Sequence, residues 1–221
     1  MKRSFDQIQN SWLYRLSKVI GDVVIISALF LLFCLPVITI GDSVTALYYT
    51  VYRKYKKKSD EVTKDFMRAL RDNLKNAVII HIIYIVYSAI VGFNIYFALN
   101  GLGGVKLPDW YTVVSFIPVL PIIFTLPFVY PLLARFSNGI KGTFTNSYTL
   151  CMINFPKFLL IWLIVLVALV ISACFPPSAL VTPVGAMYLT QMITEKAFSK
   201  AIAVEKAREE KNDESEVTED E

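Results

Sequence analysis

The sequence predicts an all-α fold: a polytopic integral membrane bundle with five to six membrane segments, helical hairpins and two cytoplasmic amphipathic helices. Apolar residues make up 55% of the 221 residues and charged residues 18%, with a mean hydropathy of +0.53. A membrane-spanning helix needs about 20 mainly apolar residues, and long runs of this kind are typical of helical spans rather than of alternating membrane strands. Charged residues are absent from 23–41, 76–105, 110–134 and 158–194.

The net charge of +4 conceals an asymmetry along the chain. Residues 205–221 hold nine of the 18 acidic residues but only three bases, so residues 1–204 carry an excess of ten positive charges. Bases beside membrane segments mark cytoplasmic loops. We therefore expect membrane lipids as partners and no nucleic acid.

The first segment, residues 1–18, predicts an interfacial amphipathic helix. Phe5, Ile8, Trp12 and Leu16 fall near one helical face, and tryptophan prefers the headgroup level of a membrane. A polar chain start without regular structure is the alternative.

Residues 19–53 allow two topologies. Basic residues flank both ends, at Lys18 and at Arg53–Lys58, so a single kinked span would place one basic flank outside, against the positive-inside rule. A hairpin avoids this conflict, and Pro36 and Gly41 are suited to its turn. The hairpin is favoured, with arms at 19–35 and 37–53.

An amphipathic helix is expected at 59–75, where Val62, Phe66 and Leu70 recur at helical spacing. Phe66 and Leu70 are candidate residues of a partner surface, although a plain solvated, positive-inside face is the favoured explanation of the charges. The next span is expected at 76–99.

The span expected at 113–134 contains four prolines, Pro118, Pro121, Pro127 and Pro131. Each proline lacks an amide hydrogen, so neighbouring helices or a cavity must cover the carbonyls left without a partner. A second amphipathic cytoplasmic helix is expected at 138–152.

Residues 158–194 are uncharged over about twice the length of one span. Pro176 and Pro177 at the midpoint predict a hairpin with arms at 158–175 and 178–194. The organisation is then one membrane domain, 19–200, followed by a charged acidic cytoplasmic tail, 201–221, with both termini cytoplasmic.

Three polar residues at membrane depth are candidates for function, since ionisable groups there are costly to bury. Asp42 follows the helix break, where it would either cap a new helix or contact a substrate. His81 is the single histidine and would form either an interhelical hydrogen bond or a proton or substrate site. Arg135 would pair with Asp22 or anchor its span at the interface.

Catalytic signatures are not recognisable in the sequence. It contains no nucleophile–base set, no metal-ligand spacing and no phosphate-binding loop. We therefore expect no enzymatic activity and no cofactor.

The stretch LPVITIG, residues 35–41, resembles the signature of the YesL-like family of bacterial membrane proteins, a domain of unknown function. The resembling positions are Leu35, Pro36, Thr39 and Gly41, and Asp65-Phe66 resembles a second feature of that family. The resemblance implies a small multi-pass protein of the bacterial plasma membrane with a role beside carbohydrate ABC importers. It supplies no catalytic or ligand-binding residues.

Three functions remain open from the sequence. The first is an accessory component of carbohydrate uptake that contacts ABC transporter permease subunits through its cytoplasmic helices. The second is an independent small-solute transporter or channel. The third is a lipid-interacting structural membrane protein.

Overall fold

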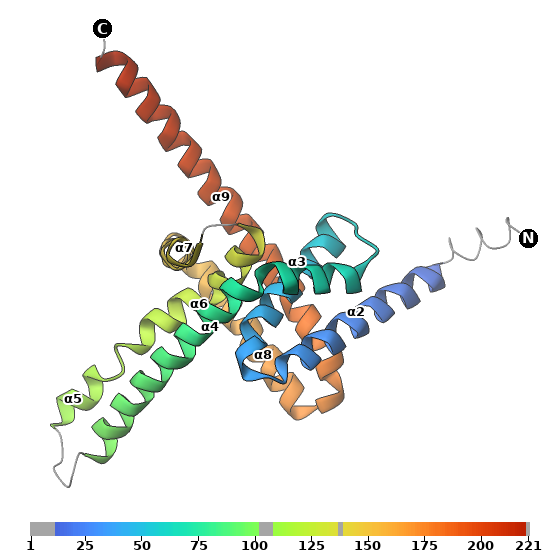
Figure 1. The fold of residues 1–221 in the computed structure, drawn as a ribbon, viewed down its shortest axis with the longest axis horizontal. Helices are drawn as coiled ribbons and strands as arrows, with labels where there is room; N and C mark the ends of the chain where they lie inside the picture. The colour runs from blue at the N-terminus through green and yellow to red at the C-terminus, as the bar shows by residue number, and fades with distance from the viewer. Residues whose placement is uncertain (1–11, 102–107, 137–138, 220–221) are drawn as a thin grey trace, which may run out of the picture.

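The computed structural model describes residues 12–101, 108–136 and 139–219, and Figure 1 shows that these ranges are almost entirely helical. No strand occurs in them, which confirms the all-α prediction. The helices are α2 (Trp12–Cys34), α3 (Ile40–Lys56), α4 (Val62–Asn100), α5 (Asp109–Val114), α6 (Val119–Arg135), α7 (Gly139–Ile153), α8 (Phe155–Cys174) and α9 (Thr182–Glu219), with short 3-10 turns η1 (Val37–Thr39) and η2 (Pro176–Leu180).

Four helical segments in the described ranges are long and apolar enough to cross a membrane: Leu16–Cys34, Val62–Asn100, Asp109–Arg135 and Phe155–Cys174. The other two arms expected from the sequence, 37–53 and 178–194, are helical but do not qualify. α3 has 17 residues, about 26 Å of helix against a hydrocarbon core of about 30 Å. α9 reaches the charged Glu195 only 13 residues after it begins. The interfacial helix expected at 1–18 lies largely outside the described residues.

α2 and α3 form the expected hairpin. Lys54 of α3 contacts Asp22 of α2, with 2.5 Å between Nζ and Oδ2, and Lys18 reaches Asp60 just beyond α3 at 2.8 Å. Both basic flanks of residues 19–53 therefore lie at the same end of the molecule, which excludes a single span. We call this end, where Arg53–Lys58 lie, the basic end.

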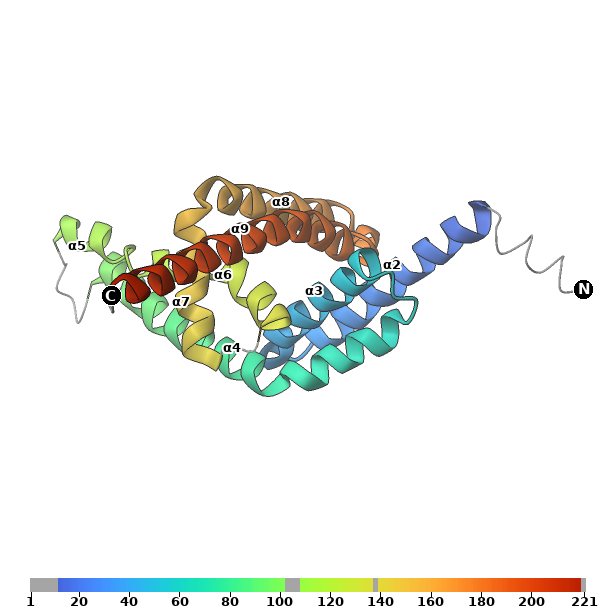
Figure 2. The same cartoon turned by 90° about the horizontal axis from the view of Figure 1, so that it is seen from above.

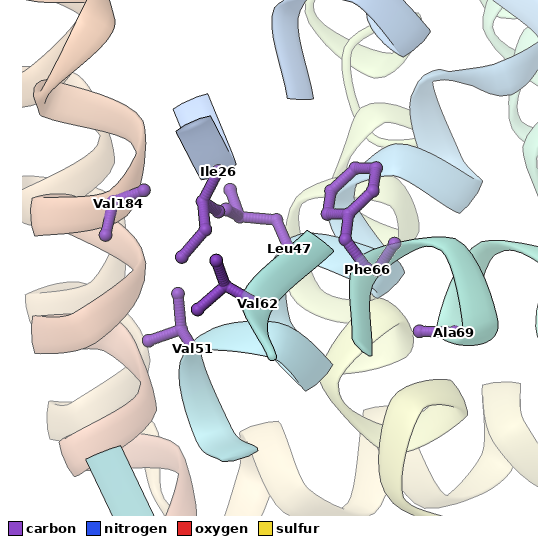
Figure 3. Packing of buried hydrophobic residues seen from close by; sticks show 8 residues of the cluster. Ile26, Leu47, Val51, Val62, Phe66, Ala69 and Val184 are labelled. Carbon is purple, nitrogen blue, oxygen red and sulfur yellow. The ribbon is translucent and has the colours of Figure 1, made fainter. Parts of the chain in front are cut away.

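α3 is the central helix of the bundle. Nine of its 17 residues are buried, and it contacts α2, α4, α6 and α9. Figure 3 shows its Leu47 and Val51 packed together with Ile26 of α2, Phe66 of α4 and Val184 of α9. A helix enclosed on this many sides can place polar groups at the centre of the bundle.

α4 joins the predicted amphipathic helix and the next span into one element. It is a single helix of 39 residues with no interruption between the charged stretch that ends at Lys75 and the apolar stretch that follows. Figures 1 and 2 show its teal beginning and its green end running in different directions, as expected for a long helix that curves around a core. The charged part of α4 is therefore structurally continuous with its span.

The proline-rich segment is covered by neighbouring helices, as the sequence required. Pro127 has no amide hydrogen for the carbonyl of Ile123, and the indole N–H of Trp162 in α8 donates to that oxygen at 3.1 Å. The hydroxyl of Tyr87 in α4 donates to the carbonyl of Pro118 at 2.9 Å.

α7 contacts α6, and α8 and α9 form the second expected hairpin. Figure 1 shows α7 nearly end-on. At the turn between α8 and α9, the hydroxyls of Ser172 and Thr182 lie 2.6 Å apart. α9 crosses α3 and continues as helix to Glu219, so the acidic segment is helical through that residue.

Candidate functional site

Two polar clusters lie beside α3, and the first forms where α3 begins. Gly41 of α3 lies directly against His81 of α4 and Tyr130 of α6. A Cβ atom at position 41 would come within 2.8 Å of Tyr130 Cε1 and 2.9 Å of His81 Cβ. Only glycine permits this close approach of the helices.

His81 and Tyr130 are joined by a hydrogen bond. Nδ1 of His81 and the hydroxyl oxygen of Tyr130 are 2.8 Å apart. One turn further along α4, the hydroxyl of Tyr84 lies 2.6 Å from that of Thr125, and Thr125 donates to the carbonyl of Pro121 at 2.7 Å. The histidine thus belongs to a row of polar contacts between α4 and α6, in agreement with the interhelical role considered from the sequence.

Asp42 is fully buried in the first turn of α3. Neither of its carboxylate oxygens accepts a hydrogen bond from any described residue, so the capping bond expected from the sequence is not formed. A carboxylate in the first turn still gains from the helix dipole, but burial without hydrogen bonds is costly. Asp42 is therefore a group for which the described structure supplies no direct partner.

The second cluster surrounds Arg135, the last residue of α6. Its Nε lies 3.3 Å from Oε1 of Glu195 in α9, and its guanidinium carbon lies 4.0 Å from the centre of the Tyr52 ring. The hydroxyl of Tyr48 donates to the same oxygen of Glu195 at 2.9 Å. The pairing of Arg135 with Asp22 considered from the sequence is wrong, because Asp22 pairs with Lys54.

α3 and α6 connect the two clusters. Gly41 and Tyr48 are seven residues apart, about 10 Å along α3, and Tyr130 and Arg135 are five residues apart, about 8 Å along α6. The three candidate residues from the sequence, Asp42, His81 and Arg135, thus all lie on or beside α3 and α6. Sequence reasoning missed Tyr48, Tyr130 and Glu195. Glu195 carries a usable signal, since it is the first charge after a long uncharged run and needs a partner if buried.

The family-like positions 35–41 shape the turn of the hairpin. The hydroxyl of Thr39 donates to the carbonyls of Phe33 at 2.7 Å and Pro36 at 2.9 Å, which holds the turn against the end of α2. Leu35 is exposed at the tip. Thr39 and Gly41 therefore have clear structural roles, the first in the turn and the second in helix packing.

The partner surface expected at Phe66 and Leu70 is not an exposed surface. Phe66 has no exposed area, and its ring centre is 6.0 Å from that of Phe33. Leu70 packs against the same core cluster. The helical spacing was interpreted correctly, but this apolar face packs against α2 and α3 of its own chain.

At the basic end, salt bridges between α2, α3 and the following loop shift the pKa of an acidic residue. A hydrogen bond from Lys18, together with the charges of Lys18 and Lys54, lowers the pKa of Asp60.

Among the described residues, no group of three or more histidines, cysteines and acidic residues is placed to hold a metal ion.

Comparison with known families finds one match. Residues 23–95 match a family described as a protein of unknown function, DUF624. The matched region runs from α2 through most of α4 and contains Gly41, Asp42 and His81. The searches of curated proteins and of solved structures find no match.

Proposed function

We propose that this protein is an accessory component of the bacterial plasma membrane, with both termini cytoplasmic, that associates with the permease subunits of a carbohydrate ABC importer. The carbohydrate process rests on the resemblance of residues 35–41 to the YesL-like family, with which the match of residues 23–95 is consistent. The structure contributes a surface suited to such an association.

The observation that carries this proposal is the outer face of α7. Lys141, Thr145, Tyr148 and Met152 follow one another at the spacing of one helical stripe, and all four are exposed. Tyr148 is 49% exposed and Met152 44%. Tyrosine and methionine are enriched in protein interfaces, and α7 lies between two candidate spans, where a permease subunit in the same membrane could reach it.

The test is purification of the tagged full-length protein from its own host in mild detergent, with quantitative mass spectrometry of co-purified proteins. We expect permease subunits in near-equal amounts, and at least about a tenfold lower yield with Tyr148→Ala/Met152→Ala. The control pair Tyr96→Ala/Met67→Ala removes the same residue types from exposed positions of α4 and should leave the yield unchanged. Purification without permease subunits, or equal losses in both pairs, would contradict the proposal.

A second function, independent transport of a small solute, is favoured by Asp42. Buried ionisable residues without partners in membrane proteins often mark ion or substrate paths. If α3 lines such a path, Asp42→Asn should abolish solute flux in reconstituted vesicles, while the exposed Asp72→Asn should not. Flux that is absent from the native protein, or unchanged by Asp42→Asn, argues against this function.

A further inference from the structure

A basic stripe on α4 faces away from the core of the bundle. Lys64, Arg68, Arg71 and Lys75 recur at intervals of four, three and four residues and are all exposed. The buried residues of the same stretch, among them Val62, Phe66 and Ala69, lie on the opposite face of the helix. We call these four residues the α4 basic stripe.

Three of the four bases form no close ion pair in the part of the chain that the structure describes. Lys64 pairs with Glu61 at 2.7 Å, but no described residue forms an ion pair with Arg68, Arg71 or Lys75. Asp65 is buried and pairs with Arg53, and the exposed Asp72 lies at the edge of the basic face, four residues after Arg68. The stripe is therefore a row of positive charge about 16 Å long.

The C-terminal part of α9 carries an acidic row of the same length. Glu205, Glu209, Asp213 and Glu216 recur at intervals of four, four and three residues in a segment that the structure shows to be helical. From first to last residue the row also spans about 16 Å. The two rows match in charge and in length.

The acidic row is not positioned to reach the basic stripe of its own chain. Phe198 of α9 packs against Phe136 at the end of α6, with 5.5 Å between ring centres, and beyond it Figure 1 shows α9 leaving the body of the protein with no other helix beside it. Residues 199–219 contain no glycine or proline at which the helix would turn back. This part of α9 thus lies away from the α4 basic stripe of its own chain.

We propose that the α4 basic stripe binds the acidic segment of α9 from a second copy of this chain. α9 leaves the bundle at the end where α6 terminates, and Arg135 there lies against Tyr52, close to the basic end at which α4 begins. Both rows are therefore available on one side of the protein. Because each copy carries both rows, two copies can exchange acidic segments reciprocally, as a two-fold symmetric pair requires.

The test uses the full-length protein labelled with a donor or an acceptor fluorophore, reconstituted together into vesicles of uncharged phosphatidylcholine. We expect energy transfer between copies that falls as salt rises, because exposed charge pairs are screened. Arg68→Glu/Arg71→Glu alone, and Glu209→Arg/Asp213→Arg alone, should each weaken the association about tenfold or more. The chain that carries all four substitutions should regain it, since the charges are then exchanged between the rows.

The outcomes separate the alternatives. An unchanged thermal unfolding midpoint in the charge-reversed chains shows that the fold is intact, as expected for residues opposite the core. Energy transfer that is absent from the native protein, or that the fourfold substitution does not restore, would overturn the proposal. A thermal unfolding midpoint that rises with added phosphatidylglycerol only when Arg68 and Arg71 are present, without energy transfer, would overturn the proposal and assign the stripe to anionic lipid instead. The result of this energy-transfer experiment does not depend on whether permease subunits co-purify with the protein.

Discussion

The indole N–H of Trp162 donates to the backbone carbonyl of Ile123 across the interface of α8 and α6, at 3.1 Å. That carbonyl lacks its usual helical partner because position 127 is a proline. One side chain from a neighbouring span thus compensates for a defect in a proline-rich span, and the position of α8 is tied to the position of that defect.

Trp162→Phe should lower the free energy of unfolding by about 1–2 kcal/mol, because the carbonyl of Ile123 is left without a donor. In a Pro127→Ala background the loss should be smaller, since that substitution supplies the missing amide hydrogen. Unfolding by SDS in mixed micelles measures both effects. Trp110→Phe, at an exposed position, is the control. Equal losses in both backgrounds would contradict this explanation.

Gly41→Ala should destabilise the bundle by about 1–3 kcal/mol, because its Cβ would overlap Tyr130 and His81. Gly92 of α4 has no atom within 4 Å of a Cβ at that position, so Gly92→Ala should be neutral or stabilising by up to about 1 kcal/mol. Thermal unfolding of the purified variants distinguishes the two. Similar effects of both substitutions would argue against the close approach of α3, α4 and α6.

Lys58→Gly should stabilise the protein by about 0.5–1 kcal/mol. Lys58 closes the end of α3 in the left-handed conformation, with φ of 55°, which is unfavourable for a residue with a side chain. Lys57 has an ordinary right-handed conformation, with φ of −98°, so Lys57→Gly should instead destabilise by about 0.5–1 kcal/mol. A loss of stability in both variants would contradict the explanation that the left-handed conformation of Lys58 is strained.

Phe66→Ala should cost about 3–5 kcal/mol, because a fully buried aromatic ring is removed from the core. Met67, the next residue, is 43% exposed, and Met67→Ala should change stability by less than about 0.5 kcal/mol. Yield of folded protein after detergent extraction, followed by SDS titration, measures the difference. A small effect at Phe66 would restore it as a candidate surface residue.

The sequence was sufficient for the hairpin of α2 and α3, because basic flanks on both sides and a Pro–Gly turn leave few other arrangements. It also required that the carbonyls of the proline-rich span be covered. It did not show that Trp162 covers the carbonyl of Ile123, since a hydrogen bond between distant helices depends on their relative rotation. This rotation is set by packing and leaves no local pattern.

The partners of the candidate residues were the least predictable part. The helical period of Phe66 and Leu70 identified an apolar face, but the pattern does not distinguish a face covered by the same chain from one covered by a partner. Arg135 could be recognised as an ionisable group at a span end, whereas its pairing with Glu195 depends on α9 crossing α3. Asp42 is buried because other helices enclose α3 on several sides. The average hydropathy of a sequence segment does not show which helices surround it.

The pairing of Arg135 with Glu195 also has a consequence for biosynthesis. Glu195 is translated 60 residues after Arg135, roughly 3–12 s later at typical rates of about 5–20 residues per second. During that interval α2, α3, α4 and α6 are complete, but the arginine between them has no anion. The cluster around Arg135 is thus completed only when α9, the last helix of the described chain, has emerged.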